Sequence, residues 1–155
     1  ADTSPNAARS RTGVIVTLSG CPLTWKSQLQ TSIACSTLEA EYCALSYALR
    51  ILLPIKCTLT KALLASLDLL AEFVSSVSCR VFEDNNGAYI LASNHRITNR
   101  TRYFLNKWHW FWWQHASSEF QLVKIDSRKQ QADYYLNKPL SRELFQNNCL
   151  LVEGW

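Results

Sequence analysis

The sequence predicts a single α/β domain. Its 155 residues, 48% of them hydrophobic and 18% charged, have the size and balance of one globular domain with a buried core. Short runs rich in β-branched and aromatic residues alternate with longer runs whose apolar residues recur every three or four positions. The first pattern is typical of strands and the second of amphipathic helices, which together predict an α/β fold.

The first predicted elements are a hairpin and a helix. Residues 13–18 and 22–25 are β-rich and flank the turn signal Ser19-Gly20. Ser36 begins a helix in the S-x-x-E pattern of a capping box, in which Glu39 returns a hydrogen bond to the backbone N–H of the cap residue. This helix is expected to run to about Leu53, because Pro54 disfavours its continuation.

Two further strands and three helices are predicted after it. Residues 78–83 form a strand, and the segment from Asp84 to Gly87 closes it before a short helix over 88–92. A helix over 105–116 precedes a strand over 120–125, and Asp133 lies in the first turn of a last helix.

Three acidic residues are candidates for function, and each also has a structural interpretation. Glu41 points toward the buried stripe of its helix, where a carboxylate needs a partner, although it could also reach solvent at the rim. Asp84 follows a strand, the usual position of functional groups in an open α/β sheet, but it could cap the next helix. Asp133 is favoured by the helix dipole regardless of any ligand.

Charge, hydropathy and cysteine content limit the class of protein. The net charge of +4 gives weak support for a polyanionic partner. No apolar run approaches the length of a membrane span, so no membrane association is expected. The six cysteines show no C-x-x-C pair or zinc-like spacing, and no signal peptide precedes them, which predicts free thiols in a protein that is not secreted.

Five motifs, read together, resemble the carboxyl-terminal ribonuclease H domain of copia-type LTR retrotransposon polyproteins. The resemblance extends over about residues 4–145. The motifs are R-S-R-T-G at 9–13, S-T-x-E-A-E-Y at 36–42, F-E-D-N-N-G-A at 82–88, Trp108-His109, and Ala132-Asp133 followed by K-P-L at 138–140.

The resemblance implies a fold and an activity. The fold is a mixed five-stranded sheet flanked by helices, and the reaction is hydrolysis of the RNA strand of an RNA–DNA hybrid. Glu41, Asp84 and Asp133 correspond to catalytic carboxylates that bind two Mg²⁺ or Mn²⁺ ions. Carboxylate oxygens are the ligands that such hard cations prefer.

The resemblance also implies that this chain lacks the central first strand and the catalytic aspartate at its end. Only Asp2 precedes the hairpin, and residues 4–13 resemble the loop that follows that strand. We therefore expect a loop remnant at 1–11, a ribonuclease H-like domain at 12–146 and a tail at 147–155. Three of the four carboxylates would then be present, and the fragment could be inactive.

Substrate contacts, partners and location follow from the same comparison. The candidate substrate-binding residues are Asn85, Arg100, Arg102, Lys107 and Lys138. The expected partners are an RNA–DNA hybrid and the upstream reverse transcriptase domain of the same polyprotein. The expected location is the cytoplasm, within a retrotransposon particle, or the nucleus.

Two alternatives remain open from the sequence. One is a non-catalytic remnant that packs against a polymerase domain or holds a hybrid without cutting it. The other is an integrase or transposase, because the spacing of Asp84 and Glu119 is one familiar from integrases. Against it, Glu119 precedes a predicted strand rather than lying on a helix.

Overall fold

The computed structural model describes residues 9–67, 78–94, 105–117, 119–133, 136, 141–143 and 145–146, with the side chains of 66–67 and 105–109 left out. The chain divides into two compact units. The first unit comprises Ala1–Ala44 and Ile125–Trp155, and the second comprises Leu45–Lys124. Helix α1 (Thr37–Leu67) begins in the first unit and continues in the second.

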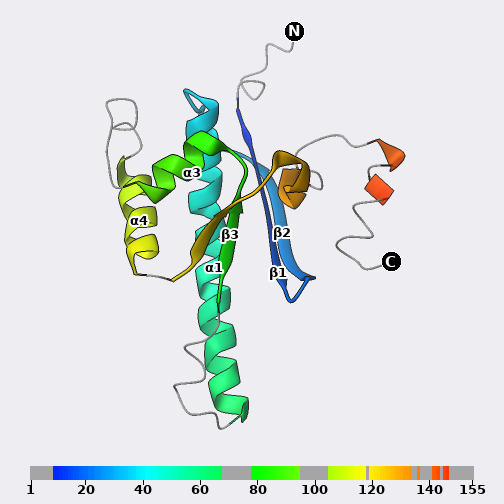
Figure 1. Ribbon diagram of the computed structural model, residues 1–155, viewed down its shortest axis with the longest axis vertical. Coiled ribbons are helices and arrows are strands. Elements are labelled where there is room, and N and C mark those ends of the chain that lie inside the picture. The colour runs from blue at the N-terminus through cyan, green and yellow to red at the C-terminus, as the bar shows by residue number, and fades with distance from the viewer. Residues whose placement is uncertain are drawn as a thin grey trace. The chain divides into compact units, whose positions relative to one another are not determined.

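The described part is α/β, as predicted. Besides α1 it contains helices α3 (Asn86–Ser93) and α4 (Leu105–Ala116). Its strands are β1 (Arg11–Leu18), β2 (Cys21–Leu29), β3 (Arg80–Glu83) and β4 (Gln121–Lys124). Among the described strands, β1 and β2 pair antiparallel and β3 and β4 pair parallel, as two separate two-stranded sheets (Figure 1).

The predicted hairpin is confirmed, and a tight two-residue turn joins its two strands. Ser19 and Gly20 have φ angles of 52° and 88°, the pair of positive values that a two-residue type I′ turn requires. Beyond the turn, a shift in register between Val16 and Thr17 marks an irregularity in the ladder. Thr12, Val14 and Val16 are buried, which is the alternation expected of a strand with one covered face.

A buried amide connects the hairpin to the start of α1. The side-chain Nε2 of Gln30 donates to Thr12 Oγ1 at 3.0 Å and to the carbonyl oxygen of Ala40 at 2.9 Å. The backbone N–H of Gln30 also donates to the carbonyl of Ser10 at 2.8 Å. These bonds satisfy a polar group that would be costly to bury alone.

The start of α1 is capped nearly as predicted. The backbone N–H of Glu39 donates to Ser36 Oγ at 3.1 Å. The Glu39 carboxylate returns to the backbone N–H of Cys35, at 2.8 Å, one residue earlier than the capping box predicts. Glu39 is therefore a structural residue, as expected.

The prediction that Pro54 ends the helix is wrong. α1 passes through Pro54 and continues to Leu67. Proline removes the N–H that would meet the carbonyl of Arg50, but both residues are exposed, so water can reach that carbonyl. Downstream, Thr58 Oγ1 donates to the Pro54 carbonyl at 2.9 Å.

The second unit is built around aromatic residues of α4 and the following loop. Phe111 is fully buried and meets Phe120 edge to face at 5.4 Å between ring centroids, and His115 meets Phe120 at 5.5 Å. The guanidinium of Arg50 on α1 lies 5.3 Å from the ring centroid of Trp110. By contrast, Trp113 is 62% exposed, so the core explains only some of these aromatic residues. No helix in the described ranges is both long and apolar enough to span a membrane.

We expect Gly20→Ala to lower the free energy of unfolding by about 1 kcal/mol. No atom lies within 4 Å of the site of an added Cβ, so the cost comes only from the positive φ of 88°. Chemical denaturation measures it. Ser19→Asn is the matched control, because asparagine tolerates a positive φ, and it should be at least as stable as the wild type. Equal losses in both variants would contradict this account of the turn.

We expect Pro54→Ala to raise the free energy of unfolding by about 2 kcal/mol, because alanine restores the missing N–H inside α1. Urea denaturation monitored by helical circular dichroism measures the change. Lys61→Ala, at an exposed position of the same helix, should change stability little. A Pro54→Ala variant no more stable than that control would show that the proline costs the helix nothing.

Candidate functional site

Asp84 lies where the sequence predicts it, directly after β3. It is half-buried, and hydrogen bonds from neighbouring residues hold the backbone around it. Lys124 Nζ, at the end of the parallel neighbour β4, donates to the Asp84 carbonyl at 3.2 Å. Since parallel strands end at the same edge of a sheet, this edge collects functional groups in many α/β proteins.

The residues on either side of Asp84 form a local turn. Glu83 is buried, and its Oε1 accepts a hydrogen bond from the backbone N–H of Asn85 at 2.9 Å. Asn85 is the N-cap of α3, and its Oδ1 accepts from the N–H of Ala88 at 3.0 Å. The side chain of Asn85, a predicted substrate contact, therefore has a structural role in the helix cap.

Glu41 lies in the amino-terminal part of α1 and is half-buried, between the buried residues Ala40 and Tyr42. Intermediate exposure is compatible with both interpretations of Glu41, the covered side of the helix and the solvent-reaching rim. Burial, and to a lesser extent Cys43, raises the pKa of the neighbouring Tyr42 above its ordinary value.

Asp133 is half-buried and lies in a short helical segment at 131–133, which agrees with its predicted place in a first helical turn. The preceding 3-10 turn, Ser127–Lys129, is capped by Asp126. Arg128 donates to that carboxylate from its side chain at 3.1 Å and from its backbone N–H at 2.9 Å. These bonds, the side-chain ones first, lower the pKa of Asp126 to about 2.

The three predicted metal ligands come from both units: Glu41 and Asp133 from the first, Asp84 from the second. In the ranges that the structure describes, no group of three or more His, Cys, Asp or Glu side chains is arranged to hold a metal ion. The assignment of these residues as ligands stays a prediction from sequence order.

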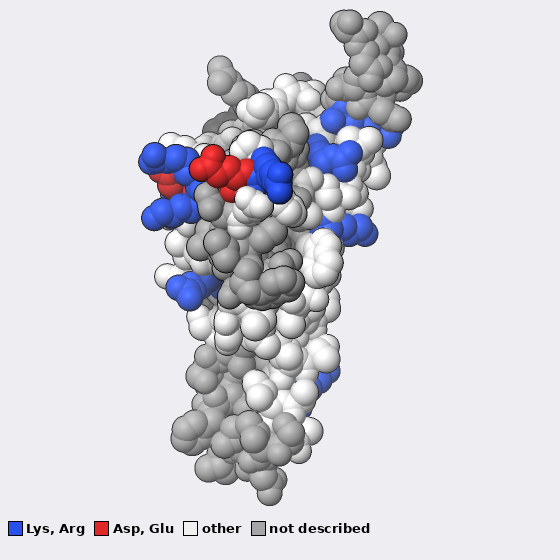
Figure 2. Space-filling model, turned by 90° about the vertical axis from the view of Figure 1, so that its right-hand side faces the viewer, with Lys and Arg blue, Asp and Glu red and all other residues white. Residues whose placement is uncertain are grey.

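Most of the other predicted substrate contacts lie outside the described residues. Arg100, Arg102 and Lys138 are among those not described, and for Lys107 only the backbone, within α4, is described. On the face shown in Figure 2, the described Lys and Arg side chains lie in several separate places, and the Asp and Glu side chains lie beside some of them in the upper part.

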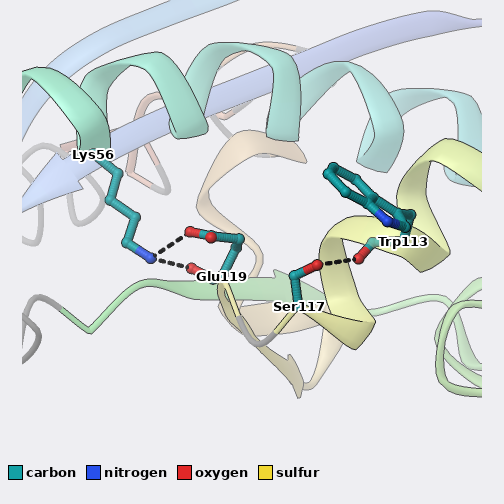
Figure 3. A network of polar contacts seen from close by, with 4 residues as sticks. All are labelled: Lys56, Trp113, Ser117 and Glu119. Carbon is teal, nitrogen blue, oxygen red and sulfur yellow. Dashed lines mark hydrogen bonds and ion pairs between the residues drawn. The ribbon is translucent and has the colours of Figure 1, made fainter.

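Glu119, the residue on which the integrase alternative depends, takes part in a structural ion pair. Lys56 Nζ donates to Glu119 Oε2 and to the Glu119 carbonyl oxygen, both at 2.8 Å (Figure 3). Glu119 lies between α4 and β4, as predicted, and not on a helix. In the same loop, Ser117 Oγ donates to the carbonyl of Trp113 at 2.9 Å, which closes the end of α4 (Figure 3).

The sequence interpretation missed Glu83 and Lys56. A signal for Glu83 was present, because Val81 and Glu83 are two residues apart on one strand and therefore share a face. No local pattern could have indicated Lys56, since its partner is 63 residues away.

Cys79, one of the five described cysteines, all of them free thiols, is affected by the same ion pair. Burial raises the pKa of the Cys79 thiol, while the charge of Lys56 lowers that pKa and the charge of Glu119 raises it.

Lys56→Met should therefore raise the pKa of Cys79 and slow its alkylation at pH 8, and Glu119→Gln should lower the pKa and speed the alkylation. Peptide mass spectrometry after timed alkylation measures both rates. Exposed Cys21 is the internal control, and rate changes of the same sign in both variants would contradict the electrostatic explanation.

Comparison with known proteins found similarity to a retrotransposon polyprotein. The chain is 29% identical over 138 residues to the Retrovirus-related Pol polyprotein from transposon TNT 1-94 of Nicotiana tabacum. The matched region covers 89% of this chain and 10% of that polyprotein, so the chain spans about a tenth of its relative's length. No protein family profile and no solved structure matches the chain. The similarity supports an origin of this chain in a retrotransposon polyprotein.

Proposed function

We propose that the chain is a ribonuclease H domain of a retrotransposon polyprotein, and that it hydrolyses the RNA strand of RNA–DNA hybrids. The observation that carries the proposal is the similarity to a Pol polyprotein over 89% of the chain, taken with the order of the three acidic segments. The α/β character of the described part and the position of Asp84 after a parallel strand are compatible with it.

The donor set suits Mg²⁺ or Mn²⁺, because Glu41, Asp84 and Asp133 offer only carboxylate oxygens. In the proposed site, two such ions would activate a water molecule and stabilise the leaving oxygen of the phosphodiester. The contribution of the chain is to hold the carboxylates in place. For Asp84 this support consists of the Lys124 contact to its carbonyl and the capped turn that follows it.

Recognition of the hybrid would depend on the backbone and the 2′-hydroxyl groups, because the reaction requires RNA but no base sequence. Arg100, Arg102, Lys107 and Lys138 are the cationic side chains proposed for the phosphate contacts. The proposed protein partner is the reverse transcriptase domain of the same polyprotein.

The test is cleavage of the labelled RNA strand of a hybrid in Mg²⁺. Glu41→Gln, Asp84→Asn and Asp133→Asn should each reduce kcat at least about a hundredfold, equivalent to about 2.7 kcal/mol of transition-state stabilisation. The matched control is Glu143→Gln, at an exposed position, which should cleave like the wild type. Each protein is assayed in two lengths: as this chain, and with about 30 additional residues at its amino end, which are enough for a strand and its connection. Full activity in the three variants would refute the site assignment.

A second candidate is a domain that binds a hybrid without cutting it. A net charge of +4 is compatible with it, because a basic protein attracts a polyanion without needing a metal site. Fluorescence anisotropy with a labelled hybrid separates the two. Binding that is independent of Mg²⁺, with no cleavage in either length of protein, would support the second candidate over the first.

A further inference from the structure

Glu83 is a buried acidic residue that has no part in the proposed reaction. The residue is 4% exposed and lies at the end of β3, immediately before Asp84. Removing a carboxylate from water is costly unless hydrogen bonds replace the lost solvation. One such bond is the 2.9 Å contact from the backbone N–H of Asn85 to Glu83 Oε1.

This bond spans Asp84. It links the side chain of the residue before Asp84 to the backbone of the residue after it, so it restricts the dihedral angles of Asp84 itself. On the far side, Asn85 is held by its cap to Ala88 and by the bond from the N–H of Tyr89 to its carbonyl, at 2.9 Å. The Asp84 carbonyl is in turn held by Lys124. The turn that carries Asp84 is thus held from β3, from β4 and from α3.

We propose that Glu83 is a positioning residue, which fixes the backbone turn of Asp84 and so the direction of its carboxylate. The effect of Glu83 on metal binding rests on the proposed function, whereas its role in holding the turn does not. The relevant property of Glu83 is its acceptor oxygen, which glutamine retains and leucine of similar size lacks. A carboxylate displaced by 1 Å can cost about a hundredfold in rate, so such a hold matters to a site of this kind.

Amide hydrogen exchange tests the hold directly. In Glu83→Leu, the amide of Asn85 should exchange about tenfold faster than in the wild type, because its acceptor is gone. Glu83→Gln should keep exchange at Asn85 close to the wild-type rate. Amides of β1, in the other unit, serve as the control for general destabilisation. Unchanged exchange in Glu83→Leu, or equal acceleration in both variants, would overturn the proposal.

A second pair of variants applies if Glu83→Leu does not fold. The variants Asn85→Ala and Asn85→Pro both lose the side chain that caps the helix. Only the proline variant also lacks the backbone N–H that donates a hydrogen bond to Glu83. The φ of Asn85 is −74°, which suits proline. If the hydrogen bond to Glu83 contributed nothing to stability, the proline variant should therefore be more stable than the alanine variant. We expect the reverse, a lower melting temperature for Asn85→Pro. A higher one would count against the role of Glu83.

The hybrid-cleavage assay then separates this proposal from the proposed function. If the wild type cleaves, Glu83→Leu should lower kcat about tenfold or more with KM nearly unchanged, and Glu83→Gln should restore most of the loss. A fully active Glu83→Leu enzyme would overturn the positioning role. If no protein cleaves, the nuclease proposal fails, and the exchange and melting results alone decide whether Glu83 holds the turn.

Discussion

The described structure depends on one constraint: removing a polar group from water is costly unless a hydrogen bond replaces the lost solvation. Gln30 meets it by joining the hairpin to the first turns of α1, and Glu83 meets it by holding the turn after β3. Both side chains lie at points where the chain leaves a strand for a helix. Buried polar contacts therefore define the backbone at the places where the candidate carboxylates Glu41 and Asp84 are presented.

Hydrogen bonds and ion pairs also sort the acidic residues. Four of them have structural roles that require no ligand: Glu39 and Asp126 at helix starts, Glu119 in an ion pair and Glu83 in a turn. This sorting weakens the integrase alternative, since Glu119 is held by Lys56. The nuclease proposal concerns Glu41, Asp84 and Asp133, whose assignment continues to depend on their order in the sequence.

Local chemistry explains which elements were predictable. The turn at Ser19-Gly20, the cap at Ser36, the position of Asp84 after its strand and the span of α4 each depend on neighbouring residues, and each is confirmed. The end of α1 was not predictable in this way. Pro54 is a strong local signal, but its cost depends on whether the group it leaves unpaired faces water, which only the folded structure reveals.

By itself, the sequence determined the class of fold, the hairpin, the starts of α1 and α4, and the order of the acidic segments that links the chain to retrotransposon polyproteins. Only the tertiary structure decided that Lys56 pairs with Glu119, that β3 runs parallel to β4, and that Glu83 is buried against the turn of Asp84. The physical reason is range. Caps, turns and hydrophobic periods act between residues a few positions apart, whereas burial and ion pairing depend on segments that become neighbours only when the chain folds.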